Sequence, residues 1–89
     1  MFSREIKILN DIGIRARIAT FFIQKANEFN STICIEKNEI KINAKSLLGV
    51  LSLEVTKGDV VKISAEGTDE RNAVYALIDL IDLSCENFE

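Results

Sequence analysis

The sequence predicts an α+β fold in which helices cover one face of a small antiparallel sheet and leave the other face open to water. Four short stretches alternate apolar and polar residues, which is typical of strands, and two longer stretches carry apolar residues at helical spacing. A further short apolar run lies between the third and fourth strands and predicts a short helix. The length of 89 residues, with 47% hydrophobic and 28% charged residues, indicates one domain covering residues 1–89.

In the first half of the chain, Ile6 and Ile8 alternate with charged residues and predict a strand that ends in a turn at residues 10–13. Residues 16–29 predict an amphipathic helix, because their apolar positions fall three or four residues apart. These positions are Ala19, Phe22, Ile23, Ala26 and Phe29. Residues 32–37 and 40–43 alternate again on either side of a polar pair, which predicts a hairpin.

In the second half, Ser46 precedes the run 47–51 and predicts a serine-capped short helix, which Gly49 weakens. Residues 59–65 predict the fourth strand, ended by Gly67. Residues 68–70 supply capping and acidic side chains for a second long amphipathic helix. Its apolar face comprises Ala73, Leu77, Leu80, Ile81 and Ser84.

Composition excludes several functions. Eleven basic against 14 acidic residues give a net charge of −3, which argues against direct nucleic-acid binding. The chain has no histidine, so histidine general bases, histidine metal ligands and phosphohistidine are excluded. The apolar runs are too short for a membrane span or a signal-peptide core, and we expect a cytoplasmic protein that does not bind membranes. Cys34 and Cys85 show no metal or disulfide spacing, so we expect free thiols. We also expect no metal, no cofactor and no enzyme activity.

Arg15 and Arg17 stand at the predicted start of the first long helix, where the helix dipole is already positive. Such a local conflict is a feature of functional sites, and an anion would resolve it. Backbone N–H groups and two guanidinium groups would together form a cradle for a phosphate or carboxylate. The alternative is that both arginines are solvated surface charges.

Five large apolar residues follow Ser46 within seven positions, more than a short helix can bury on one face. We therefore expect some of them to be exposed beside a serine that phosphorylation could modify, which would make a switchable docking surface. The alternative is that Ser46 is an ordinary N-cap and that the leucines belong to the core.

Three segments carry a resemblance to a known family. Residues 13–19 read Gly-Ile-Arg-Ala-Arg-Ile-Ala, residues 43–46 read Asn-Ala-Lys-Ser, and residues 67–70 read Gly-Thr-Asp-Glu. With this spacing, the chain resembles HPr, the phosphocarrier of the bacterial sugar phosphotransferase system, over essentially its whole length. The resemblance implies an open-faced β-sandwich with strand order 1-4-2-3.

The family's first motif normally reads Gly-Leu-His-Ala-Arg-Pro-Ala, and its histidine passes phosphate from enzyme I to sugar permease subunits. Here Arg15 stands at the histidine position and Ile18 at the proline position. Arginine is always protonated and offers no lone pair to a phosphoryl donor, so the resemblance implies that phosphorelay fails. Arg17 matches the family arginine that holds the phosphoryl group.

The second motif is intact, and in Gram-positive relatives its serine, here Ser46, is the target of HPr kinase/phosphorylase. The chain is similar to the Crh-type branch of catabolite-repression proteins, which lack the histidine, keep the serine and bind a LacI-type transcription factor. The resemblance implies a docking surface of Arg17, Leu47, Leu48 and Leu51. Other readings are a true phosphocarrier, an anion sensor using Arg15 and Arg17, a partner of enzyme I or permease subunits without phosphotransfer, and a decayed paralogue.

Overall fold

The computed structural model describes residues 1–9 and 16–87. In chain order its elements are β1 (Phe2–Lys7), α1 (Ala16–Asn27), β2 (Thr32–Lys37), β3 (Ile40–Asn43), α2 (Leu47–Ser52), β4 (Val60–Glu66) and α3 (Glu70–Asn87). This order confirms the one predicted from periodicity. The predicted turn at residues 10–13, and Arg15 with it, lie outside the described residues.

The strands form one antiparallel sheet in the order β1-β4-β2-β3, which confirms the order implied by the family resemblance. Residues Asn38 and Glu39, which join β2 to β3, have φ values of 52° and 70°. Two positive φ values are typical of the tight hairpin turn whose twist matches that of the flanking strands. The polar pair in the sequence therefore marks the hairpin correctly.

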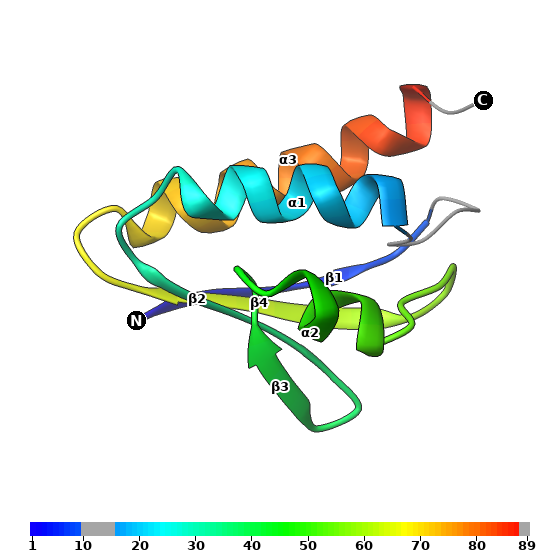
Figure 1. Cartoon of the computed structure of the whole chain (residues 1–89), viewed down its shortest axis with the longest axis horizontal. Helices are drawn as coiled ribbons and strands as arrows, with labels where there is room; N and C mark the ends of the chain where they lie inside the picture. The colour runs from blue at the N-terminus through cyan, green and yellow to red at the C-terminus, as the bar shows by residue number, and fades with distance from the viewer. Residues whose placement is uncertain (10–15, 88–89) are drawn as a thin grey trace.

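The helices cover one face of the sheet, where α1 and α3 lie side by side (Figure 1). Alternate strand residues point at these helices and are fully or almost fully buried, among them Ile33, Ile35, Val61 and Ile63. The short helix α2 contacts α1 and β3, and its Val50 belongs to the same core. The period-two pattern of the strands thus selects the face that the helices bury.

The other face of the sheet carries polar side chains. The strand register aligns Ser3, Ser64, Cys34 and Asn43 in one row across all four strands. The next row is Glu5, Lys62, Glu36 and Lys41, in which the sign of the charge alternates from strand to strand. Opposite charges on neighbouring strands favour this register, because a slip would bring like charges together.

The prediction for α1 was too long by two residues, because the helix ends at Asn27 rather than at Phe29. The N–H groups of Glu28 and Phe29 donate to carbonyls three residues back, at 3.1 and 3.3 Å. Such tighter bonds are typical of a last helical turn that closes the chain toward the next element.

Asp69 ties the start of α3 to the start of β2. Its carboxylate accepts hydrogen bonds from the N–H groups of Asn30 (2.9 Å) and Ser31 (3.0 Å), and also from the Ser31 hydroxyl. The hydroxyl bond first, and then the backbone bonds, lower the pKa of this carboxyl. The sequence predicted a capping role for residues 68–70, and Glu70 does accept from the Gly67 N–H at 3.2 Å, whereas Asp69 bonds to another element.

Lys37 joins three segments at the opposite end of the sheet. Its ammonium donates to the carbonyl oxygens of Leu53 (3.0 Å) and Glu54 (2.8 Å), just after α2, and pairs with the Asp59 carboxylate at 2.9 Å. Bonds from the Thr56 backbone and from Lys37 lower the pKa of Asp59. These contacts hold the segment that follows α2 against the sheet.

Candidate functional site

Ser46 is the N-cap of α2, as the sequence predicted. Its backbone is extended, with φ −105° and ψ 115°, and its Oγ accepts a hydrogen bond from the Gly49 N–H at 3.2 Å. Its carbonyl accepts the first helical bond, from the Val50 N–H at 2.9 Å. The hydroxyl is half-buried, so it is held in place by the helix and still reaches the surface.

Gly49 makes this cap possible at close range. A Cβ atom on Gly49 would lie 3.2 Å from the Ser46 Oγ and 3.3 Å from the Ile42 Cδ1, both tighter than ordinary van der Waals contact. The glycine costs helix propensity, which is why the sequence indicated a weak helix. The structure shows what it provides in return, namely space for the serine side chain over the first turn.

The turn before Ser46 is fixed by hydrogen bonds to two other elements. The Asn43 Oδ1 accepts from the Lys45 N–H at 2.8 Å, and the Ala44 N–H donates to the Ile33 carbonyl on β2 at 2.9 Å. The Lys45 ammonium donates to the Phe29 carbonyl at 2.8 Å, beyond the end of α1. The Ser46 hydroxyl is therefore presented on a rigid turn rather than on a loose loop.

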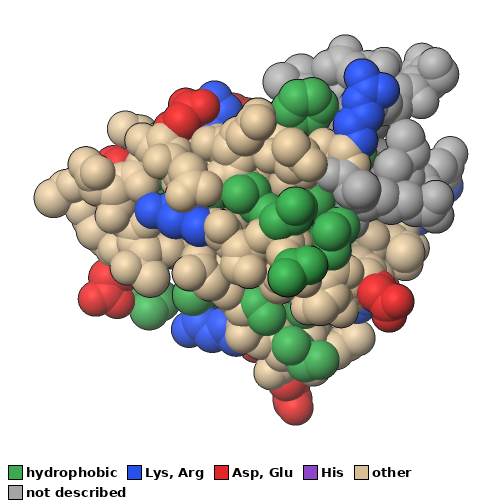
Figure 2. All heavy atoms as spheres, viewed as in Figure 1, with side chains coloured by type: hydrophobic (Ala, Val, Ile, Leu, Met, Phe, Trp, Pro, Cys, Tyr) green, Lys and Arg blue, Asp and Glu red, His purple; other side chains and the backbone are tan. Residues whose placement is uncertain are grey.

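An apolar patch lies beside this serine. Leu48 is 81% exposed and Leu47 is 42% exposed, whereas Leu51 is half-buried and packs against the core. Figure 2, viewed from the same side as Figure 1, shows hydrophobic side chains gathered in the region of α2. The expectation that some of these residues are exposed is confirmed, and Leu47 with Leu48 forms the exposed part.

Of the two predicted anion-binding arginines, the structure describes only Arg17. Arg17 is exposed on the first turn of α1, a turn that contains no acidic residue, and α1 contacts α2. Arg15 falls outside the described residues, so the predicted cradle of both arginines stays a prediction. Among the side chains that the structure describes, in residues 1–9 and 17–81, no group of three or more His, Cys, Asp or Glu could hold a metal ion.

Two residues of α1 have places that the sequence analysis missed. Ile18, left out of the apolar face, is 1% exposed and belongs to the core, while Phe21 is 44% exposed. Neighbouring bulky residues in a helix point in different directions, so Phe21 and Phe22 cannot both face the core. That adjacency was the available signal for an exposed aromatic side chain on the helix that contacts α2.

Comparison with known proteins identifies the family and supports the fold. A family model described as the PTS HPr component phosphorylation site matches residues 2–82. The chain belongs to the HPr family. The phosphocarrier protein HPr of Neisseria meningitidis serogroup A is 38% identical to it over 82 residues, which cover 92% of each chain.

A second relative of this chain is the HPr-like protein Crh of Halalkalibacterium halodurans. The two are 40% identical over 82 residues, which cover 92% of this chain and 98% of that protein. The crystal structure of HPr-C-His from Thermoanaerobacter tengcongensis superposes with a TM-score of 0.92 at 47% identity, covering 98% of both chains. HPr proteins are phosphocarriers, and this chain therefore has both phosphocarrier and Crh relatives. Among the described residues, no helix is long and apolar enough to cross a membrane.

Proposed function

We propose that this chain is a regulatory HPr-family protein that is phosphorylated on Ser46, docks on protein partners and does not carry phosphohistidine. The observation that carries the proposal is the absence of any histidine from a chain that keeps a capped, accessible serine beside exposed leucines. Arg15 stands where the family motif has its histidine, and a protonated guanidinium has no lone pair with which to accept a phosphoryl group.

Phosphorylation of Ser46 would act as an electrostatic switch on an otherwise unchanged fold. It adds a charge of about −1.5 to −2 at the start of a helix, where negative charge is favourable. A phosphate oxygen can replace the hydroxyl as acceptor for the Gly49 N–H. The Lys45 ammonium is already bonded to the Phe29 carbonyl, so much of the new charge remains for an arginine-bearing partner.

The docking surface in this proposal consists of Arg17, Leu47, Leu48 and Leu51. Leu48 is its principal apolar contact, because it exposes far more of its side chain than Leu51, which packs inward. The partners are an HPr kinase/phosphorylase, which modifies Ser46, and a LacI-type regulator, which binds the phosphorylated form. Enzyme I and permease subunits are noncovalent partners at most. The similarity to the HPr-like protein Crh supports this assignment.

The test is incubation with an HPr kinase and ATP, followed by intact mass and peptide mapping. We expect one phosphate on Ser46 of the wild-type protein and none on the Ser46→Ala variant. Ser52→Ala is the matched control, because Ser52 is an exposed serine at the other end of the same helix and should leave phosphorylation unchanged. Failure of the kinase to modify Ser46 would remove the switch from the proposal.

Docking is tested separately with the phosphorylated protein and a LacI-type regulator. We expect Leu48→Ala to weaken binding about tenfold, the loss expected when one well-buried apolar contact is removed from an interface. Ile40→Ala is the control, because Ile40 is 58% exposed in the β2–β3 hairpin, outside the docking surface. Equal binding by the two variants would place the partner elsewhere on the molecule.

A further inference from the structure

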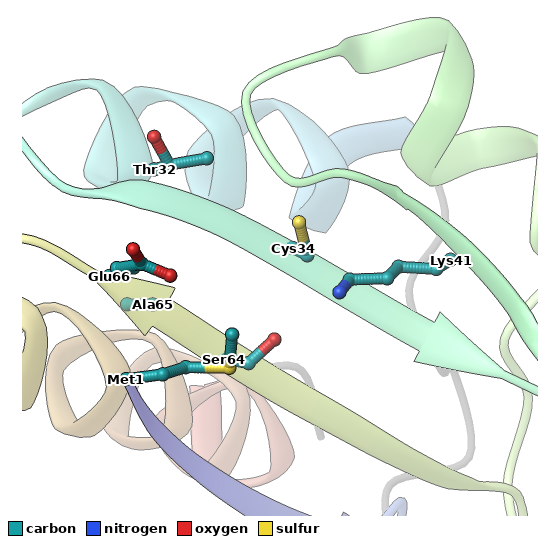
Figure 3. Close-up of a pocket in the computed structure, with 7 residues that line it drawn as sticks. All are labelled: Met1, Thr32, Cys34, Lys41, Ser64, Ala65 and Glu66. Carbon is teal, nitrogen blue, oxygen red and sulfur yellow. The ribbon is translucent and has the colours of Figure 1, made fainter.

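A cavity of about 260 Å³ opens on the sheet face that the helices leave uncovered (Figure 3). Its lining residues come from β2, β3 and β4 and also include Met1, which precedes β1, and none of them belongs to the docking surface around Ser46. The lining combines Thr32, Cys34, Lys41, Ser64 and Glu66, so it offers a thiol, two hydroxyls and one charge of each sign. This volume suits a ligand of amino-acid size rather than a nucleotide.

Ser64 is the first sign that the cavity takes a ligand. The residue is 7% exposed, and its hydroxyl has no hydrogen-bond partner among the side chains that the structure describes, whereas the hydroxyl of Ser31, the other buried serine among them, donates to Asp69. Figure 3 shows the Ser64 oxygen directed toward the end of the Lys41 side chain. A buried hydroxyl without a partner costs stability, which is explained if a ligand supplies the partner.

The charges of the cavity are arranged along the strands. Glu66 lies opposite Thr32, and Lys41 lies opposite Glu36, four residues further along β2. These two rows are about 13 Å apart along the strand, and the long Lys41 side chain reaches back across β2 into the gap (Figure 3). A zwitterionic amino acid fits this pattern, with its carboxylate toward Lys41 and Ser64 and its ammonium group toward Glu66.

Cys34 provides a reactive group between these charges. It is a free, half-buried thiol that lines the cavity, on the strand next to that of Ser64. We propose that Cys34 is a modification site that forms a mixed disulfide with a thiol of the amino-acid class, seated in the cavity by Lys41, Ser64 and Glu66. This site lies outside the Ser46 surface and does not depend on the function proposed for it.

The reaction is a thiol–disulfide exchange with a small symmetrical disulfide as the oxidant. The Cys34 thiol loses its proton, and its sulfur attacks one sulfur of the disulfide. The new S–S bond forms as the old one breaks, and the released thiolate takes up a proton. Cys34 is oxidised, and one half of the disulfide leaves reduced as the free thiol.

The experiment uses the folded Cys85→Ser protein, which keeps Cys34 as its single cysteine, with cystine as the probe. We expect one cysteinyl adduct on Cys34 by intact mass and peptide mapping. Hydroxyethyl disulfide, which lacks the charged groups, is the comparison, and each rate is divided by the rate for the same protein unfolded in guanidinium. On this scale cystine should react about fivefold faster than the uncharged disulfide, the ratio expected for one exposed charge pair.

Three variants separate recognition from simple thiol exposure. Lys41→Gln should remove the preference for cystine, whereas Lys62→Gln, at another lysine on the same sheet face, should keep it. Ser64→Ala should weaken the preference without lowering the free energy of unfolding, because the lost hydroxyl has no protein partner. Absence of a Cys34 adduct, or the same preference in the Lys41→Gln and Lys62→Gln variants, would overturn the proposal.

Discussion

The first turns of α1 and α2 differ in what they can do with a phosphoryl group. The first turn of α1 carries the exposed guanidinium of Arg17 and no acidic residue. The first turn of α2 begins at a serine whose Oγ accepts a hydrogen bond from Gly49. A guanidinium can bind an anion but cannot form a bond to phosphorus, whereas a hydroxyl can accept a phosphoryl group from an enzyme and ATP.

The proposed function implies that anion binding and phosphoryl acceptance are separable properties of one fold. In the proposed function, Arg15 replaces the histidine of the family motif and Arg17 keeps its arginine. The start of α2 is held by the backbone bonds around residues 43–50 and by Val50 in the core. The proposed function therefore expects the Ser46 site to work without the family histidine.

The largest effect is expected for Arg15→His, which would break the difference between the two helix starts. An imidazole at this position has a free nitrogen near neutral pH, so phosphoenolpyruvate and enzyme I should label the variant where they leave the wild-type protein unlabelled. Arg15→Gln is the matched control, because an amide removes the positive charge without supplying a nucleophile. Label on the glutamine variant would point to an acceptor elsewhere in the chain.

Two leucine variants compare a core leucine with a leucine of the docking surface. Leu77 is a fully buried residue of α3, and Leu77→Ala should lower the free energy of unfolding by about 2–5 kcal/mol. Leu48 is 81% exposed, and Leu48→Ala should change the free energy of unfolding by less than about 0.5 kcal/mol. Urea unfolding of both variants measures this contrast. A large loss of unfolding free energy in Leu48→Ala would show that Leu48 is a core residue and not part of the surface.

A smaller effect tests the cap itself. Ser46→Ala removes the acceptor for the Gly49 N–H and should cost about 1 kcal/mol of unfolding free energy. Ser46→Asp keeps an acceptor oxygen at the N-cap and should retain most of that stability. If urea unfolding gave the same loss for alanine and aspartate, the hydroxyl would have no capping role, and its position would need another explanation.

The weakest effect concerns the carboxylates that hold the sheet and helices together. Hydrogen bonds from Ser31 and Asn30 lower the pKa of Asp69 in the folded protein, so its contribution to stability is complete above the ordinary pKa of the carboxyl group and is lost as the pH falls through the folded pKa. The free energy of unfolding should therefore decrease below about pH 5. Asp69→Asn should make this decrease shallower, and the bonds of Asp59 should maintain the remaining slope. Identical pH profiles for wild type and variant would contradict this role.

Local patterns in the sequence were sufficient for the elements of the fold but not for their arrangement. The alternation in residues 32–37 and 59–65 placed Ile33, Ile35, Val61 and Ile63 correctly in the core. The strand order came from the family resemblance, since periodicity says nothing about which strands pair. The hydrogen bonds of Asp69 to Asn30 and Ser31 join residues 38 or 39 positions apart, and no local pattern marks them.

The candidate site was predicted where its chemistry is local. Ser46 was recognised as an N-cap because capping depends on a few neighbouring residues, and the surplus of leucines indicated exposure. The degree of exposure was not predictable, because the burial of Leu51 and the exposure of Leu48 depend on how α2 sits against α1 and β3. The cavity beside Cys34 was not predicted either, because its formation depends on the register in which three strands pair.

The most direct test of the account is a two-arm labelling of the wild-type protein. One arm supplies phosphoenolpyruvate and enzyme I, and the other supplies ATP and an HPr kinase. The account predicts no label in the first arm and acid-stable label on Ser46 in the second. An acid-labile phosphoryl adduct in the first arm would show that the chain still accepts phosphate from the sugar-uptake relay, and would contradict the account.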